Sequence, residues 1–119
     1  MKVFAVDGTM NVTTVTLDKI ASDIRSRAVE GDVAFLFDTH TYGEAQAVRA
    51  QDIFVGSGSG AWLECVLVRA SELGASEVYI YGDGFWLGKG SDCRGMNVQQ
   101  VLVGSGPFNN DFPVVATIS

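Results

Sequence analysis

The sequence has few of the features that mark cysteine metal sites, membrane spans or nucleic-acid surfaces. Its two cysteines, Cys65 and Cys93, stand in no C-x-x-C or Cys/His metal spacing, so we expect two thiols and no zinc site. No apolar run approaches the roughly 20 residues of a membrane-spanning helix, which argues against a membrane partner. The eight Lys and Arg residues are scattered singly, and without a basic run we expect no nucleic-acid partner.

Recognisable catalytic patterns are also missing. The single histidine, His40, has no serine or cysteine nucleophile paired with it in the sequence, and we expect it at the surface of a turn. The segment 56–60, GSGSG, lacks the Gly-Lys-Ser/Thr ending of a phosphate-binding P-loop. The sequence therefore assigns no catalytic residue.

The composition is that of one folded domain. Hydrophobic residues make up 47% and charged residues 18% of the 119 positions, enough for one core and too short for a second domain. The formal net charge of −6 favours solubility and can attract a cation. The first apolar stretch contains Asp7 and is interpreted as a strand, not as a secretory signal, which predicts a cytoplasmic location.

Short apolar runs ended by turn residues predict strands between helical segments. We expect strands over 2–6, 32–37, 77–81, 98–103 and 113–118, and a hairpin from 38–43 to an edge strand over 50–55. Apolar residues recur at helical spacing from Leu17 to Ala28, where Thr14 or Thr16 can cap the start. A second helix ends at Gly74, and its buried face is predicted to hold Trp62, Leu63, Val66, Leu67 and Ala70.

Strands that alternate with helices predict the fold class. We expect an α/β fold with a single doubly wound, mostly parallel sheet and helices on both faces, which is a Rossmann-like arrangement. The first strand is expected at the sheet centre, between the strands near 33–37 and 78–81. Ligands bind beyond the carboxyl ends of such strands, where Asp7, Asp38, Asp83 and the GSGSG loop are all expected.

Oxygen-bearing side chains gather at these strand ends. Two carboxylates with nearby hydroxyl and amide oxygens are the hard donors that Mg²⁺ or Mn²⁺ prefers, with waters or a partner group completing the shell. The predicted metal-binding residues are Asp7, Thr9, Asn11, Ser57, Ser59 and Asp83.

Four segments in this order resemble the von Willebrand factor A domain family: AVDGTMN, FLFDTHTY, GSGSG and VYIYGDG. The resemblance spans about residues 3–103 and implies a protein-binding module in which a Mg²⁺ ion meets a carboxylate of a protein partner. The family's metal site takes an Asp-x-Ser-x-Ser loop, a Thr from a second loop and an Asp from a third. Asp7 and Thr9 match the first two loop positions, and Asp83 matches the last.

The match departs from the family pattern in two places. Asn11 stands where the family has its second loop serine, and an amide oxygen is a bulkier ligand without a hydroxyl. The second-loop threonine is replaced by serine, either Ser57 or Ser59. Asp7 and Asp83 can also be explained without a metal, as residues that end strands and accept backbone hydrogen bonds in Asx turns.

A small α/β enzyme is the alternative interpretation. The segment VDGT resembles a fragment of the haloacid-dehalogenase phosphatases, but Ala5 stands where that family has its nucleophilic aspartate. The stretch GSGSGAWLECVLVRA resembles a segment of proteasome-type peptidases, whose nucleophile is an N-terminal threonine exposed by processing.

Overall fold

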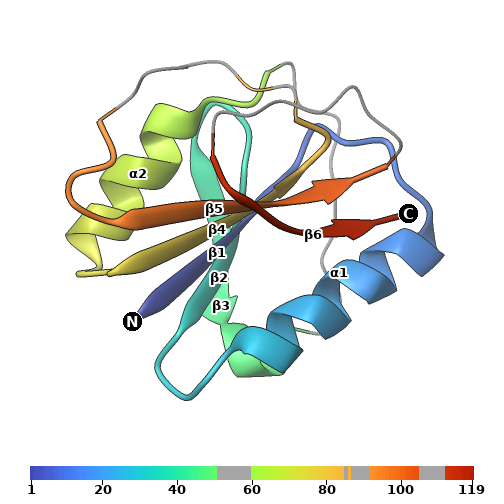
Figure 1. Cartoon of the computed structure of the whole chain (residues 1–119), viewed down its shortest axis with the longest axis horizontal. Coiled ribbons are helices and arrows are strands. Elements are labelled where there is room, and N and C mark those ends of the chain that lie inside the picture. Colours follow the sequence, from blue (N-terminus) through green and yellow to red (C-terminus); the bar gives the residue numbers. More distant parts are fainter. Residues whose placement is uncertain (51–59, 85, 87–91, 105–111) are drawn as a thin grey trace.

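A computed structural model describes residues 1–50, 60–84, 86, 92–104 and 112–119 of the chain, and its central feature is one mixed six-stranded sheet (Figure 1). The strands are β1 (Lys2–Asp7), β2 (Val33–Phe37), β3 (Thr41–Gln46), β4 (Glu77–Gly82), β5 (Asn97–Val103) and β6 (Val114–Ile118). Within the described residues the helices are α1 (Thr14–Arg27), α2 (Leu63–Glu72) and the 3-10 turn η1 (Ala47–Arg49). No helix in these ranges is both long and apolar enough to cross a bilayer.

The strand order is β3-β2-β1-β4-β5-β6. Every neighbouring pair is parallel except β2 and β3, which form an antiparallel hairpin. The prediction that the first strand lies between the strands near 33–37 and 78–81 is confirmed. Its last five residues are buried, which explains why Val3 to Val6 form an unbroken apolar run.

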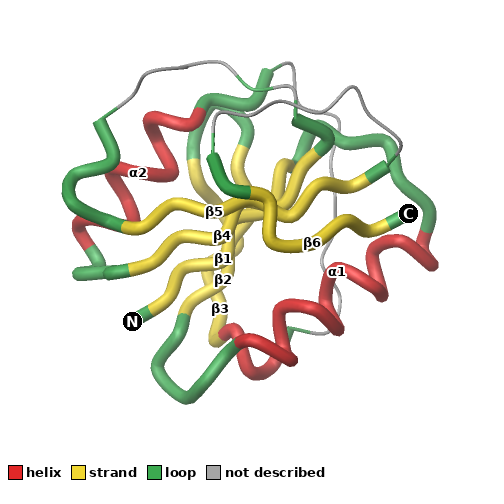
Figure 2. Tube along the Cα trace, viewed as in Figure 1, coloured by secondary structure: helices red, strands yellow, loops and turns green. Residues whose placement is uncertain are grey.

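The two helices pack on opposite faces of the sheet. Successive side chains of a strand point to opposite faces, so β1 contributes to two separate cores. Val3 and Ala5 lie in the core cluster that contains the buried residues of α2, whereas Phe4 and Val6 lie in the cluster that contains Ile20 and Ile24 of α1. Figure 2 shows the two helices on either side of the sheet.

The N-cap of helix α1 lies one residue before the nearer of its two expected caps. Thr13, not Thr14 or Thr16, is the N-cap, and its hydroxyl accepts a hydrogen bond from the Thr16 backbone N–H at 3.2 Å. A polar contact fastens the helix to the sheet, because the Tyr81 hydroxyl on β4 donates to Asp23 at 2.6 Å.

Helix α2 confirms four of its five predicted core residues and contradicts one. Leu63, Val66, Leu67 and Ala70 are buried, but Trp62 is 44% exposed. Trp62 is the N-cap of α2 and has extended backbone angles, so the helical spacing that relates it to Val66 does not apply. The prediction that Trp62 lies in the core was wrong for this reason.

The hairpin forms, but its edge strand comes earlier in the chain than expected. It is β3, which pairs with β2 across a short turn and has a register shift in the pairing. Ala50, at the start of the expected 50–55 strand, has extended backbone angles after η1 but belongs to no strand, and residues 51–55 lie outside the described part of the chain.

Candidate functional site

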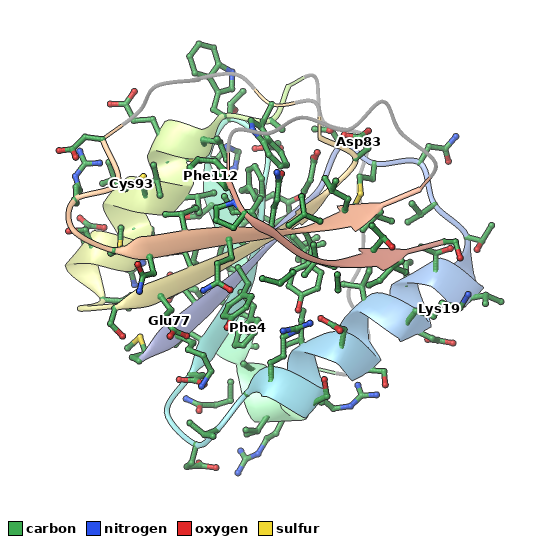
Figure 3. The ribbon with its side chains drawn as sticks, viewed as in Figure 1. Phe4, Lys19, Glu77, Asp83, Cys93 and Phe112 are labelled. Carbon is green, nitrogen blue, oxygen red and sulfur yellow. The ribbon has the colours of Figure 1, made fainter. Side chains whose placement is uncertain are left out.

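The carboxyl ends of β1 and β4 bring two acidic residues together. Asp7 is the last residue of β1, and Asp83 follows directly after β4. The parallel register pairs Val6 with Tyr81, which sets Asp7 beside Gly82. A Cβ atom on Gly82 would lie only 3.4 Å from the Asp7 Oδ2 atom. Figure 3 shows Asp83 at the end of β4, at the sheet edge from which the loop after β1 also leaves.

The two oxygens of the Asp7 carboxylate have different surroundings. Oδ1 accepts hydrogen bonds from the Thr9 backbone N–H at 2.8 Å and from the Thr9 hydroxyl at 2.6 Å, which is an Asx turn reinforced by a side chain. Oδ2 is buried and has no hydrogen-bond partner among the described residues. The turn interpretation therefore accounts for one oxygen and leaves the other unexplained.

Burial makes the negative charge of Asp7 unfavourable. Asp7 is fully buried, and its pKa is raised above the ordinary value chiefly by desolvation. The hydrogen bonds from Thr9 lower the pKa, and the nearby charge of Asp83 raises it further. A divalent cation beside these carboxylates would relieve both the desolvation and the repulsion.

Tyr42 and Trp86 also lie near Asp7, and no motif or spacing in the sequence points to either residue. A side chain on Gly8 would collide with the Tyr42 hydroxyl, which places that hydroxyl against the loop after β1. Burial and the charges of Asp38 and Asp7 raise the pKa of Tyr42, so it stays a neutral hydroxyl. The Trp86 ring lies against Gly82, and its indole N–H is buried without a partner among the described residues.

Of the other residues predicted to bind a metal, the structure places only some near Asp7. Thr9 is half-buried and contacts Asp7, whereas Asn11 is exposed in the same loop. Ser57 and Ser59 lie outside the described residues. Within the ranges described, no group of three or more His, Cys, Asp or Glu side chains could hold a metal ion. A cation here would therefore depend on hydroxyl or amide oxygens as well as on the two carboxylates.

Asp38 belongs to the β2–β3 turn. Its Oδ1 atom accepts a hydrogen bond from the His40 backbone N–H at 3.0 Å and lies 3.2 Å from His40 Nδ1. Its backbone oxygen accepts from the Trp62 N–H at 2.8 Å, which ties the turn to the start of α2. The His40 side chain is 71% exposed, and this confirms its expected surface position.

The segments that resemble enzyme families lie partly in regular elements of the fold. Ala5 is a fully buried residue of β1, and the LECVLVRA part of the peptidase-like stretch lies in α2. Cys65 and Cys93 are both thiols, as expected.

No protein-family model matches the chain, and no curated protein matches it.

Proposed function

We propose that this chain is a protein-binding module of the von Willebrand A type that recognises a partner carboxylate through a Mg²⁺ or Mn²⁺ ion held by its strand-end loops. The proposal includes a doubly wound, Rossmann-like organisation of the sheet and a cytoplasmic location. Asp7, Thr9 and Asp83 are the described residues proposed to hold the cation, and Asn11 and one of Ser57 or Ser59 are further candidates.

The topology supports this choice of site. In open α/β sheets with the strand order 3-2-1-4-5-6, ligands bind outside the carboxyl ends of the strands where the order reverses. Here the chain moves outward from β1 to β3 and then returns to place β4 on the other side of β1. The reversal point lies between β1 and β4, and Asp7 and Asp83 stand at their ends.

The unpartnered Oδ2 atom of Asp7 is the observation that carries the proposal. Leaving a buried charged oxygen without a partner is costly, and proteins normally satisfy such atoms with a hydrogen bond or an ion. Asp7 Oδ2 lies at the reversal point, with a second carboxylate close enough to raise its pKa. A hard divalent cation fits this donor set and, when bound, supplies an open coordination position for a partner's carboxylate.

A melting experiment in the presence of metal tests the proposal. Ligand that binds only the folded state stabilises it by about 2.7 kcal/mol at a hundredfold excess over the dissociation constant. We expect Mg²⁺ or Mn²⁺ in the millimolar range to raise the melting temperature of the wild type. Asp7→Asn and Asp83→Asn should abolish the rise, while Asp18→Asn, which changes an exposed aspartate of α1, should keep it.

Acetate serves as the probe for the partner carboxylate. If the partner's oxygen completes the shell, the metal-induced rise in melting temperature should grow in sodium acetate relative to sodium chloride at the same ionic strength. The baseline is protein from which bound metal has been removed with a chelator. The absence of any rise in melting temperature in both salts would reject the metal site.

A further inference from the structure

A groove between the β2–β3 turn and helix α2 has the features of a second contact surface. It is a hollow of about 430 Å³ between residues 39–41 and helix α2, and we call it the α2 groove. Trp62, Cys65 and Val68 supply its apolar lining. The indole of Trp62 is 44% exposed there, and large exposed aromatic side chains are enriched among the residues that dominate protein interfaces.

The α2 groove and its immediate surroundings hold more carboxylates than cationic side chains. Arg69 is the one Lys or Arg among the described residues of its lining, which also includes His40, and the Arg69 guanidinium makes a two-pronged contact with the Glu44 carboxylate on β3. Glu72 lies 3.5 Å from the same guanidinium, and Glu64 makes no ion pair within the described ranges. Because Glu44 already neutralises Arg69, Glu64 and Glu72 leave the α2 groove with an excess of negative charge.

The spacing of the two carboxylates constrains the partner. Glu64 and Glu72 are eight residues apart on one helix, which corresponds to about 12 Å along the axis. In an extended peptide, residues four positions apart lie on the same side and are separated by about 13 Å. Trp62 lines the same groove as Glu64, and a cationic side chain bound over its indole would gain a cation–π contact.

We infer that the α2 groove binds an extended segment of a partner protein with two basic residues four positions apart. This inference adds a second contact surface to the proposed protein-binding function. It rests on that proposed function for the assumption that the partner is a protein. The groove itself needs no metal, so its binding is measured with a chelator present. Failure of the groove and failure of the metal site are then seen in separate experiments.

The probe is the peptide acetyl-Arg-Thr-Val-Thr-Arg-amide, and its control is acetyl-Arg-Arg-Thr-Val-Thr-amide, which has the same composition and charge. NMR titration follows the two indole N–H signals, of which the Trp62→Phe variant assigns one to Trp62. We expect the first peptide to shift the Trp62 signal, to bind several-fold more tightly than the control, and to weaken with added salt. The signal of buried Trp86 should move little.

Single charge changes test the residue assignment. Glu64→Gln and Glu72→Gln should each weaken binding by about 2- to 5-fold, the range of one exposed ion pair. Glu30→Gln changes an exposed glutamate after α1 and should leave binding unchanged. These surface variants are expected to fold normally, which their melting temperatures check. Equal binding of the two peptides, no shift of the Trp62 signal, or a Trp62 shift on raising the protein concentration without peptide would overturn the inference.

Discussion

The two oxygens of the Asp7 carboxylate differ in what they contact. Oδ1 closes the turn with Thr9, and Oδ2 faces Gly82 without a hydrogen-bond partner in the described part of the chain. The sequence could predict an oxygen cluster here because a parallel strand ending in Asp-Gly delivers its side chain to the ligand edge of a sheet. It could not predict that one oxygen is left over, because that depends on the neighbours that β4 supplies.

Gly8 offers a test at the scale of one residue. A Cβ atom at this position would collide with the Tyr42 hydroxyl and would lie 3.2 Å from the Phe37 backbone oxygen. Gly8→Ala should therefore destabilise the protein by about 1–3 kcal/mol, the usual cost of overpacking. Chemical denaturation measures this loss of unfolding free energy.

The Tyr42→Phe variant is the matched background for that test. Removing the hydroxyl takes away the closest clashing atom and leaves the ring carbon that bears it at 3.3 Å. Gly8→Ala should then cost clearly less than in the wild type. An equal cost in both backgrounds would show that the hydroxyl does not limit the space at Gly8.

At the scale of elements, the sequence predicted strands and helices well where burial sets the periodicity. The strands expected over 32–37, 77–81 and 98–103 are found within one residue of their expected ends because they are apolar runs bounded by turn residues. The final strand, β6, is also present. Periodicity failed at Trp62, where the helix has not yet begun, and in the hairpin, where β3 is mostly exposed and has little apolar pattern.

The buried face of α2 gives the prediction at this scale. Leu67 is fully buried among residues of β1 and α2, so Leu67→Ala should lower the unfolding free energy by about 2–5 kcal/mol through transfer and cavity effects. The neighbouring Val68 is half-exposed, and Val68→Ala should cost less than about 1.5 kcal/mol. Urea unfolding compares the two variants. Similar losses for both would contradict the assigned face.

Across the whole molecule, two buried aspartates stand at opposite ends of β1. Asp32 accepts hydrogen bonds from the backbone N–H groups of Lys2 and Val29, each at 2.9 Å, and lies 3.2 Å from the Lys2 ammonium group. Burial alone would raise the pKa of Asp32, but these three contacts together lower it below the ordinary value of 3.8. The sequence could not assign this role, because it requires the start of β1 to lie beside the turn before β2.

The opposite pKa shifts of Asp32 and Asp7 predict opposite pH effects. The folded protein holds the Asp32 proton less tightly than the unfolded chain does, so Asp32 contributes stability above its unfolded pKa, and this is lost as the pH falls through the folded pKa. Asp7 has a raised pKa, so without metal its stabilising contribution is present below its unfolded pKa and is lost as the pH rises through the folded value.

Two substitutions separate these contributions. At pH 7 without metal, Asp32→Asn should destabilise the protein by about 1–3 kcal/mol, because a buried N–H loses its acceptor. Asp7→Asn should stabilise it, by on the order of 1 kcal/mol, because an unpaired buried charge is removed. Both differences from the wild type should shrink as the pH falls, first for Asp7, whose pKa is raised, and at lower pH for Asp32, whose pKa is lowered.

Lys2 and Asp7 are the two ends of β1, about 17 Å apart at the rise of a strand, so the effects of the two substitutions on the unfolding free energy should add in the double variant within about 0.5 kcal/mol. Melting curves from pH 3 to 8 measure all four proteins, and a destabilised Asp7→Asn variant at pH 7 would show that Asp7 Oδ2 has a partner beyond the described residues.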